Sequence, residues 1–161
     1  HNYLTINKGT RDGIAEDMGV VCYSGVVGIV SAVSEKYALV VPTIHTEMNL
    51  SCRLKKNDYV GRTQWMGKNY QQVALKDISR HISVERGDTV ITSGLTPIFP
   101  EGIMVGIVEE TSLNISDNYH QTTLQLSTDY RSIKYVQVIK NRASQLINND
   151  NSPTQWSGLK K

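Results

Sequence analysis

The sequence has few of the residues on which common catalytic, metal and membrane functions depend. Its 161 residues include two cysteines and four scattered histidines, with no CxxC or HxxxH spacing. Zinc sites usually need such closely spaced pairs. No Gly-rich phosphate loop precedes a helical pattern, and no apolar run approaches the roughly 20 residues of a membrane helix. We therefore expect neither a metal site nor a cofactor.

The charge disfavours a nucleic-acid-binding protein, and the cysteines favour a chain without disulfides. The formal net charge is +2, and Lys and Arg are scattered rather than gathered into the basic stripe that nucleic-acid binding usually requires. Cys22 and Cys52 lie in alternating apolar runs, which favours two reduced or unpaired core residues. A disulfide would need adjacent strands, which the sequence alone does not establish.

Period-two alternation of apolar and polar residues dominates the chain and predicts short strands separated by Gly and Asn turns. Only Ile14–Met18 and Arg142–Ile147 suggest a helical turn or two. This pattern is typical of an all-β fold, either a sandwich or small barrels. Residues 142–161 include an Asn-rich stretch with little to bury and are predicted to form a flexible tail, in which Trp156 has no assigned role.

A framework occurs twice. In both copies a strand ends in Ser-Gly, at Ser24-Gly25 and Ser93-Gly94, and is followed by the letters VGIV and a further strand carrying Thr43 or Thr128. This repetition predicts two similar β modules. The second copy has nine extra residues between Ser-Gly and VGIV, namely the segment Leu95–Ile103.

The segment Leu95–Ile103 lies within the stretch Val84–Val108, around which the chain is organised. Pro97 and Pro100 cannot donate to a sheet ladder, so the segment must leave the sheet. Its apolar residues have two interpretations: they close one end of their own barrel, or they contact a partner. The candidate partner-binding residues are Leu95, Ile98, Phe99 and, at a strand start, Tyr37.

A serine-peptidase triad of Ser93, His45 and either Asp88 or Asp129 is the main alternative. It is disfavoured because Ser93 belongs to the repeated Ser-Gly, which indicates a backbone role. No G-x-S-x-G nucleophile motif occurs. A carbohydrate-binding module is a weaker alternative, since no pair of Trp residues lies on one strand face. The expectation is a non-enzymatic binding or scaffolding protein.

Several motifs resemble those of the MreC family of rod shape-determining proteins. The resemblance runs from about Asn2 to Lys140. It includes Asn2–Gly9 and a string of the form GDxVxTSG…FPxG…VG between Gly87 and Gly106. The framework positions that carry it are Gly25, Gly28, Gly87, Asp88, Ser93, Gly94, Pro100, Gly102 and Gly106.

The resemblance implies two small six-stranded β-barrels, similar to those of trypsin-like proteases but without the triad. It also implies a scaffold of the cell-elongation machinery that binds and activates peptidoglycan synthases. The implied partners are a class B penicillin-binding transpeptidase, MreD, MreB, RodA and further copies of the chain. The expected location is the periplasmic face of the bacterial inner membrane, with a membrane anchor upstream of this fragment. The expected modules are residues 1–66 and 67–141, with strand exchange between them left open.

Overall fold

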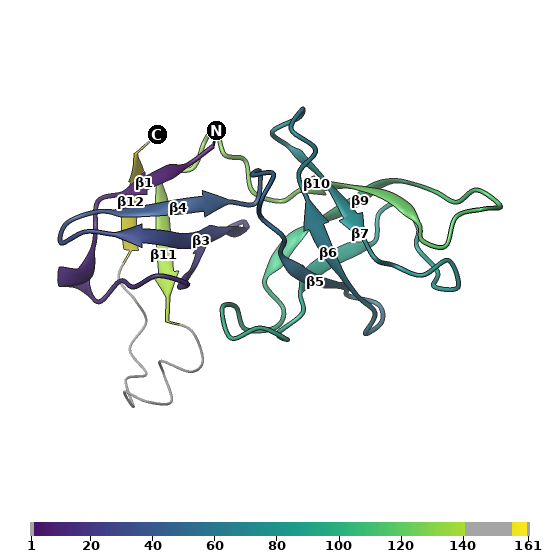
Figure 1. Cartoon of the computed structure of the whole chain (residues 1–161), viewed down its shortest axis with the longest axis horizontal. Coiled ribbons are helices and arrows are strands. Elements are labelled where there is room, and N and C mark those ends of the chain that lie inside the picture. The colour runs from purple at the N-terminus through teal and green to yellow at the C-terminus, as the bar shows by residue number, and fades with distance from the viewer. Residues whose placement is uncertain (1, 141–155, 161) are drawn as a thin grey trace.

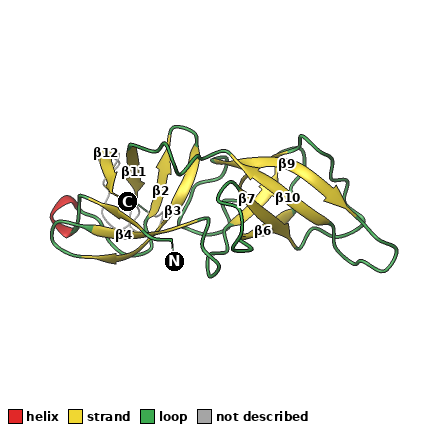
Figure 2. Ribbon diagram, turned by 90° about the horizontal axis from the view of Figure 1, so that it is seen from above, coloured by secondary structure: helices red, strands yellow, loops and turns green. Residues whose placement is uncertain are grey.

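The chain folds into two closed β-barrels that lie side by side along the long axis of the molecule (Figures 1 and 2). The computed structural model describes residues 2–140 and the backbone of residues 156–160. One 3-10 helix, Thr10–Asp12, is the only helix among these residues. The prediction of an all-β fold with two six-stranded barrels and little helix is confirmed.

The first barrel combines strands from both ends of the chain. Its strand order is β1-β12-β11-β2-β3-β4, closed by pairing of β4 with β1, and every pairing is antiparallel. The strands are β1 Leu4–Ile6, β2 Gly19–Cys22, β3 Gly25–Val33, β4 Ala38–Pro42, β11 Tyr135–Ile139 and β12 Trp156–Lys160.

The second barrel uses one continuous stretch between β4 and β11. Its strand order is β10-β7-β6-β5-β8-β9, closed by pairing of β9 with β10. The strands are β5 Ser51–Leu54, β6 Val60–Gln64, β7 Gln72–Lys76, β8 Thr89–Thr92, β9 Met104–Ser112 and β10 Gln121–Leu126.

Alternating burial along the strands explains why both barrels close. In β10 every second residue is buried, as in β5 and β7, because successive side chains point to opposite faces. The inward residues are mainly branched aliphatics that suit a pleated, buried surface. Examples with no exposed surface are Val20, Val30 and Val40 in the first barrel and Leu54, Val90 and Leu124 in the second.

The two barrels have the same topology, but the chain enters them at different points. The second barrel is built in the order β5, β6, β7, β8, β9, β10. Matching neighbours to neighbours gives the order β11, β12, β1, β2, β3, β4 in the first. The first barrel is therefore a circular permutation of the second, opened between β12 and β1. Both chain ends accordingly lie on the same side of this barrel (Figure 1).

The predicted duplication is confirmed in atomic detail. Val20 pairs with Gly28 and Val90 pairs with Gly106, and each ladder has a bulge one residue later. The two-residue connection between β2 and β3 corresponds to residues 93–103 between β8 and β9, which reproduces the nine-residue difference. One detail differs. The backbone N–H groups of Thr43 and Ser127 donate to Val27 and Val105, so Ser127, rather than Thr128, is the counterpart of Thr43.

The predicted module boundaries are wrong. Strands β5 and β6 precede residue 67 but pair in the second barrel, and β11 returns to the first. Alternation identifies a strand without identifying its neighbours, so the sequence placed the boundary too late. Residues 142–155 of the predicted tail, including the helix expected at Arg142–Ile147, lie outside the described residues. Residues Trp156–Lys160, predicted as tail, form strand β12.

Candidate interaction surfaces

The residues of the possible serine-peptidase triad have separate partners. The Ser93 hydroxyl lies 2.7 Å from the Ser51 hydroxyl and accepts a hydrogen bond from the backbone of Leu95. His45 accepts a hydrogen bond through Nδ1 from the backbone of Glu47. Asp88 pairs with Lys56 at 2.8 Å. No contact recorded for the described residues joins Ser93, His45 and Asp88 into a relay.

The alternative acid, Asp129, belongs to a local turn. It accepts hydrogen bonds from the backbone and the guanidinium of Arg131, and these contacts lower the pKa of its carboxyl from the ordinary value. Asp129 lies on the connection between the barrels, and its carboxylate is bound by Arg131. In the described part of the chain, no group of three or more His, Cys, Asp or Glu residues could hold a metal ion.

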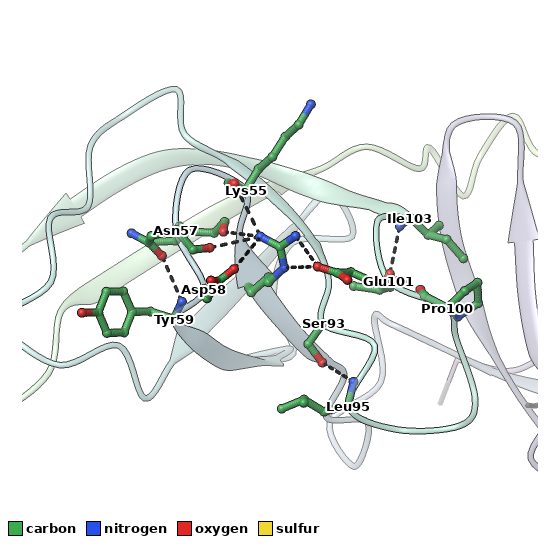
Figure 3. Close-up of polar contacts among 12 residues, drawn as sticks. Lys55, Asn57, Asp58, Tyr59, Ser93, Leu95, Pro100, Glu101 and Ile103 are labelled. Atoms are coloured by element: carbon green, nitrogen blue, oxygen red, sulfur yellow. Dashed lines mark hydrogen bonds and ion pairs between the residues drawn. The ribbon is translucent and has the colours of Figure 1, made fainter.

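The segment Leu95–Ile103 is held in place by Thr92, the last residue of β8. The Thr92 hydroxyl donates to the carbonyl of Pro100 at 2.7 Å and accepts from the backbone N–H of Ile103 at 2.9 Å. Figure 3 shows the bond at Ile103 and, beside it, the bond from Leu95 to Ser93. One threonine thus replaces, at the base of the segment, the ladder bonds that the prolines cannot make.

Arg53 fastens the same segment to the second barrel. From β5, its guanidinium donates through Nε and Nη2 to the carboxylate of Glu101. Its Nη1 donates to backbone carbonyl oxygens of the β5–β6 turn, where Asp58 lies 3.8 Å away. Figure 3 shows the turn residues Asn57 and Asp58 on one side of this cluster and Glu101 on the other. The Arg53 side chain is only 16% exposed, whereas that of Glu101 is 56% exposed, so the pair joins a largely buried guanidinium to a carboxylate at the surface.

Phe99 does not face solvent. Only 2% of it is exposed, and its ring lies on β2 of the first barrel, where a Cβ on Gly19 would come within 2.6 Å of Cε1. The expectation that Phe99 contacts a partner is wrong, because the first barrel covers its ring. The expectation that it plugs its own barrel is also incomplete, since its neighbour belongs to the other barrel. Sequence reasoning treated the modules separately and so missed this contact.

The other predicted contact residues are spread over two places. Leu95 is 71% exposed, and Ile98 is partly buried against the core. Tyr37 is exposed in the turn between β3 and β4, at the end of the first barrel that points away from the second (Figure 1). Leu95 and Ile98 therefore share one segment, whereas Tyr37 lies apart from them. Partner binding by Leu95, Ile98 and Tyr37 stays a prediction.

The framework glycines are required where backbones approach closely. A Cβ on Gly28 would lie 2.1 Å from the carbonyl oxygen of Val41, and one on Gly106 would lie 2.4 Å from that of Gln125. A Cβ on Gly25 would meet the carbonyl oxygen of Met104, in the other barrel, at 2.3 Å. Gly94 and Gly102 allow the left-handed turns that begin and end the proline segment. At each of these glycines, either the close approach of another backbone or a positive φ disfavours other residues.

A hydrogen-bonded seam joins the two barrels. The connection between β10 and β11 lies along the start of β3, where Thr128 donates to the carbonyl of Val26 at 2.9 Å. Tyr130 donates to Val27 and accepts from the backbone of Thr43. Burial raises the pKa of the Tyr130 hydroxyl, which keeps it a donor. Two side chains of this connection, Thr128 and Tyr130, thus bind the backbone at the start of β3.

A cleft of about 520 Å³ opens beside the seam. It is lined by the β2–β3 turn and the connection between the barrels, including Cys22, Tyr23, Ile133 and Tyr135. Tyr23 is 97% exposed at its mouth. The spacing of apolar residues did not predict this cleft, although an aromatic residue at the first position of a two-residue turn was an available signal.

Both cysteines are free and buried. The expectation of unpaired core residues is confirmed for Cys22 and Cys52. Burial raises the pKa of the Cys52 thiol to about 12, so it stays neutral.

The family model described as rod shape-determining protein MreC, barrel core, matches residues 1–140. The chain belongs to the MreC family. It is 25% identical over 146 residues to the cell shape-determining protein MreC of Listeria monocytogenes, covering 89% of this chain and 50% of the relative. The chain thus spans about half the length of that MreC protein.

Solved MreC structures have the same fold. The crystal structure of MreC from Pseudomonas aeruginosa superposes with a TM-score of 0.81 at 22% identity, covering 86% of this chain and 88% of that one. A complex between a penicillin-binding protein and MreC from Helicobacter pylori matches with a TM-score of 0.56 at 25% identity. It covers 71% of this chain and 73% of that one.

MreC family membership agrees with the prediction of a non-enzymatic protein, since the relatives are named as determinants of cell shape. Within the described residues, no helix is long and apolar enough to cross a membrane.

Proposed function

We propose that this chain is the extracytoplasmic part of a scaffold that controls cell shape by binding and activating peptidoglycan synthases. The observation that carries the proposal is the match of the MreC barrel core to residues 1–140. The penicillin-binding protein complex of the Helicobacter pylori relative supports a class B transpeptidase as the partner. The proposal includes self-association, further contacts to MreD, MreB and RodA, and a membrane anchor outside this sequence.

The proposed contact is the exposed part of the proline segment, centred on Leu95 and extending to Ile98. Thr92 and Arg53 hold the base of this segment, so little conformational entropy is lost when it docks. Leu95 leaves most of its side chain in water, and covering a leucine contributes about 1.5–3 kcal/mol. The segment therefore offers a pre-arranged apolar contact at the surface.

The test is binding of Leu95→Ser to the extracytoplasmic domain of the cognate class B transpeptidase. We expect the Kd to rise at least about tenfold, which corresponds to about 1.4 kcal/mol. Ile115→Ser is the matched control, because Ile115 is 95% exposed on another loop of the same barrel. Unchanged binding by Leu95→Ser would move the contact elsewhere, and Tyr23→Ser would then test the cleft.

Activation needs a separate measurement. Addition of the wild-type chain should increase the rate of peptide cross-linking by the transpeptidase, and Leu95→Ser should shift the half-maximal concentration by the same factor as the Kd. Binding without any change in rate would leave a scaffold that positions the synthase without activating it.

A further inference from the structure

Strand β12 fills a slot between two strands of the first barrel. Its backbone pairs with β1 at Thr5–Lys160 and with β11 at Val136–Ser157, antiparallel on both sides. Both neighbours otherwise pair on one side only, β1 with β4 and β11 with β2. Without β12 they would be two edge strands facing each other, each with a row of unpaired N–H and C=O groups. The slot therefore has the pairing requirements of one antiparallel strand.

The equivalent strand of the second barrel is tethered much more tightly. That strand, β6, lies between β5 and β7, as β12 lies between β11 and β1. It is joined to β5 by residues 55–59 and to β7 by residues 65–71, whereas residues 140–155 join β12 to β11. Antiparallel neighbours need only two to five connecting residues. The 16-residue connection does not confine β12 to its own barrel.

The position of β12 relative to the matched family core also matters. The slot is formed by β1 and β11, which lie inside the matched family core, whereas β12 follows residue 140. The acceptor thus belongs to the barrel core and the donor to the segment that follows it.

We propose that the slot between β1 and β11 is a strand-binding site that β12 of a second copy fills when the chain self-associates. A second copy is the occupant that fits, because its β12 offers the same backbone and the same register. The exchange keeps every barrel pairing, so only the cost of association opposes it. The inference deepens the self-association in the proposed function and rests on it.

The protein concentration determines whether β12 occupies the slot of its own barrel or that of a second copy. Because 16 residues join β12 to β11, β12 has an effective concentration on the order of 1 mM near its own slot. Exchange therefore needs a comparable concentration of the second copy, or a local density that anchoring in a membrane would supply. When a concentrated sample is refolded, the slot of a second copy competes with the slot of its own barrel for β12.

A disulfide that fixes β12 in its own barrel tests the proposal. Thr5 and Lys160 are partners across the antiparallel ladder, where Cα atoms approach within the range of a disulfide. The double variant Thr5→Cys with Lys160→Cys, refolded dilute and oxidised, should stay monomeric in light scattering. The same protein reduced and refolded at about 1 mM should contain at least ten times more dimer.

A mixture of single variants identifies the surface. One copy carries Thr5→Cys and a differently tagged copy carries Lys160→Cys. Refolded together, they should form a disulfide that joins the two differently tagged copies. Ser31→Cys with Lys160→Cys is the control, because Ser31 is exposed on β3, which does not pair with β12. The native thiols are buried and do not compete.

Three results would overturn strand exchange. Dimerisation of the oxidised double variant at the wild-type level would place self-association on another surface and leave the proposed function intact. A Thr5–Lys160 disulfide no more abundant than the Ser31 control would do the same. Monomers under all conditions would remove self-association as well, while transpeptidase binding by the Leu95 variants would be unaffected.

Discussion

The hydroxyl of Tyr130 donates a hydrogen bond to the carbonyl oxygen of Val27, with 2.5 Å between the two oxygens. The two residues are 103 positions apart, one on the connection leaving the second barrel and the other on β3 of the first. The same hydroxyl accepts from the backbone N–H of Thr43, on the connection that enters the second barrel. One side chain thus ties together both passages of the chain between the barrels.

Tyr130→Phe should lower the free energy of unfolding by about 1–3 kcal/mol, because it leaves a buried N–H and C=O with one partner fewer. Urea unfolding followed by circular dichroism measures this. Tyr135→Phe is the control: Tyr135 is exposed, so loss of its hydroxyl group should change the free energy of unfolding by less than about 0.5 kcal/mol. Equal effects of the two substitutions would show that the seam adds nothing to stability.

Phe99→Ala should cost about 3–5 kcal/mol, since it empties a buried site between the barrels. Gly19→Ala should also destabilise the chain, because its methyl group would collide with the Phe99 ring. In a double-mutant cycle, the cost of Gly19→Ala should be smaller once Phe99 is alanine. Additive effects would mean that the two residues do not meet in solution. Leu95→Ala serves as the exposed control on the same segment.

Gly28→Ala and Gly106→Ala should destabilise the chain to similar extents, by about 1–3 kcal/mol or more, because each new methyl group would meet a backbone carbonyl of the next strand. Gly13→Ala is a useful comparison, since a Cβ there meets nothing and only its φ of 82° opposes the change. We expect a cost of about 1–2 kcal/mol at Gly13. Thermal unfolding of the three variants would show whether the duplicated positions behave alike.

Arg53→Lys should cost about 1–3 kcal/mol, because a lysine cannot hold Glu101 and the turn carbonyls at the same time. Glu101→Gln should cost less than about 1 kcal/mol, since the Glu101 side chain is largely exposed. Limited proteolysis within Leu95–Ile103 would report loosening of the segment directly. If the Arg53→Lys variant resists proteolysis as well as the wild type does, Thr92 fixes the segment without Arg53.

Stability should fall as the pH rises above 9. Burial raises the pKa of Cys52 from 9.0 to about 12, so between these values the unfolded chain loses a proton that the folded chain keeps. The unfolded state then binds fewer protons, and the free energy of unfolding decreases by about 1.4 kcal/mol per pH unit for this group. Cys52→Ala should reduce that slope by about one proton, as measured by urea unfolding from pH 8 to pH 11. An unchanged slope would assign the pH dependence to other groups, among them Tyr130.

Residue patterns predicted most of the strands but not their neighbours. Alternation predicted short strands along the chain, and the repeated VGIV predicted two related modules, because both signals are local. The assignment of β5 to the second barrel depends on pairing with β8, some 40 residues later. The burial of Phe99 depends on Gly19, 80 positions earlier. Neither relationship leaves a mark in the local spacing of apolar residues, and the prolines that isolated Leu95–Ile103 did not reveal which barrel covers it.

The insertion of the second barrel within the first sets an order of events during synthesis. Every strand from β5 to β10 lies in one uninterrupted stretch, so this barrel has all its partners once residue 126 has emerged from the ribosome. The first barrel begins earlier but must wait for β11 and β12, and strands β1 to β4 remain an open sheet until then. The half of the molecule that is translated first is therefore the half that finishes folding last.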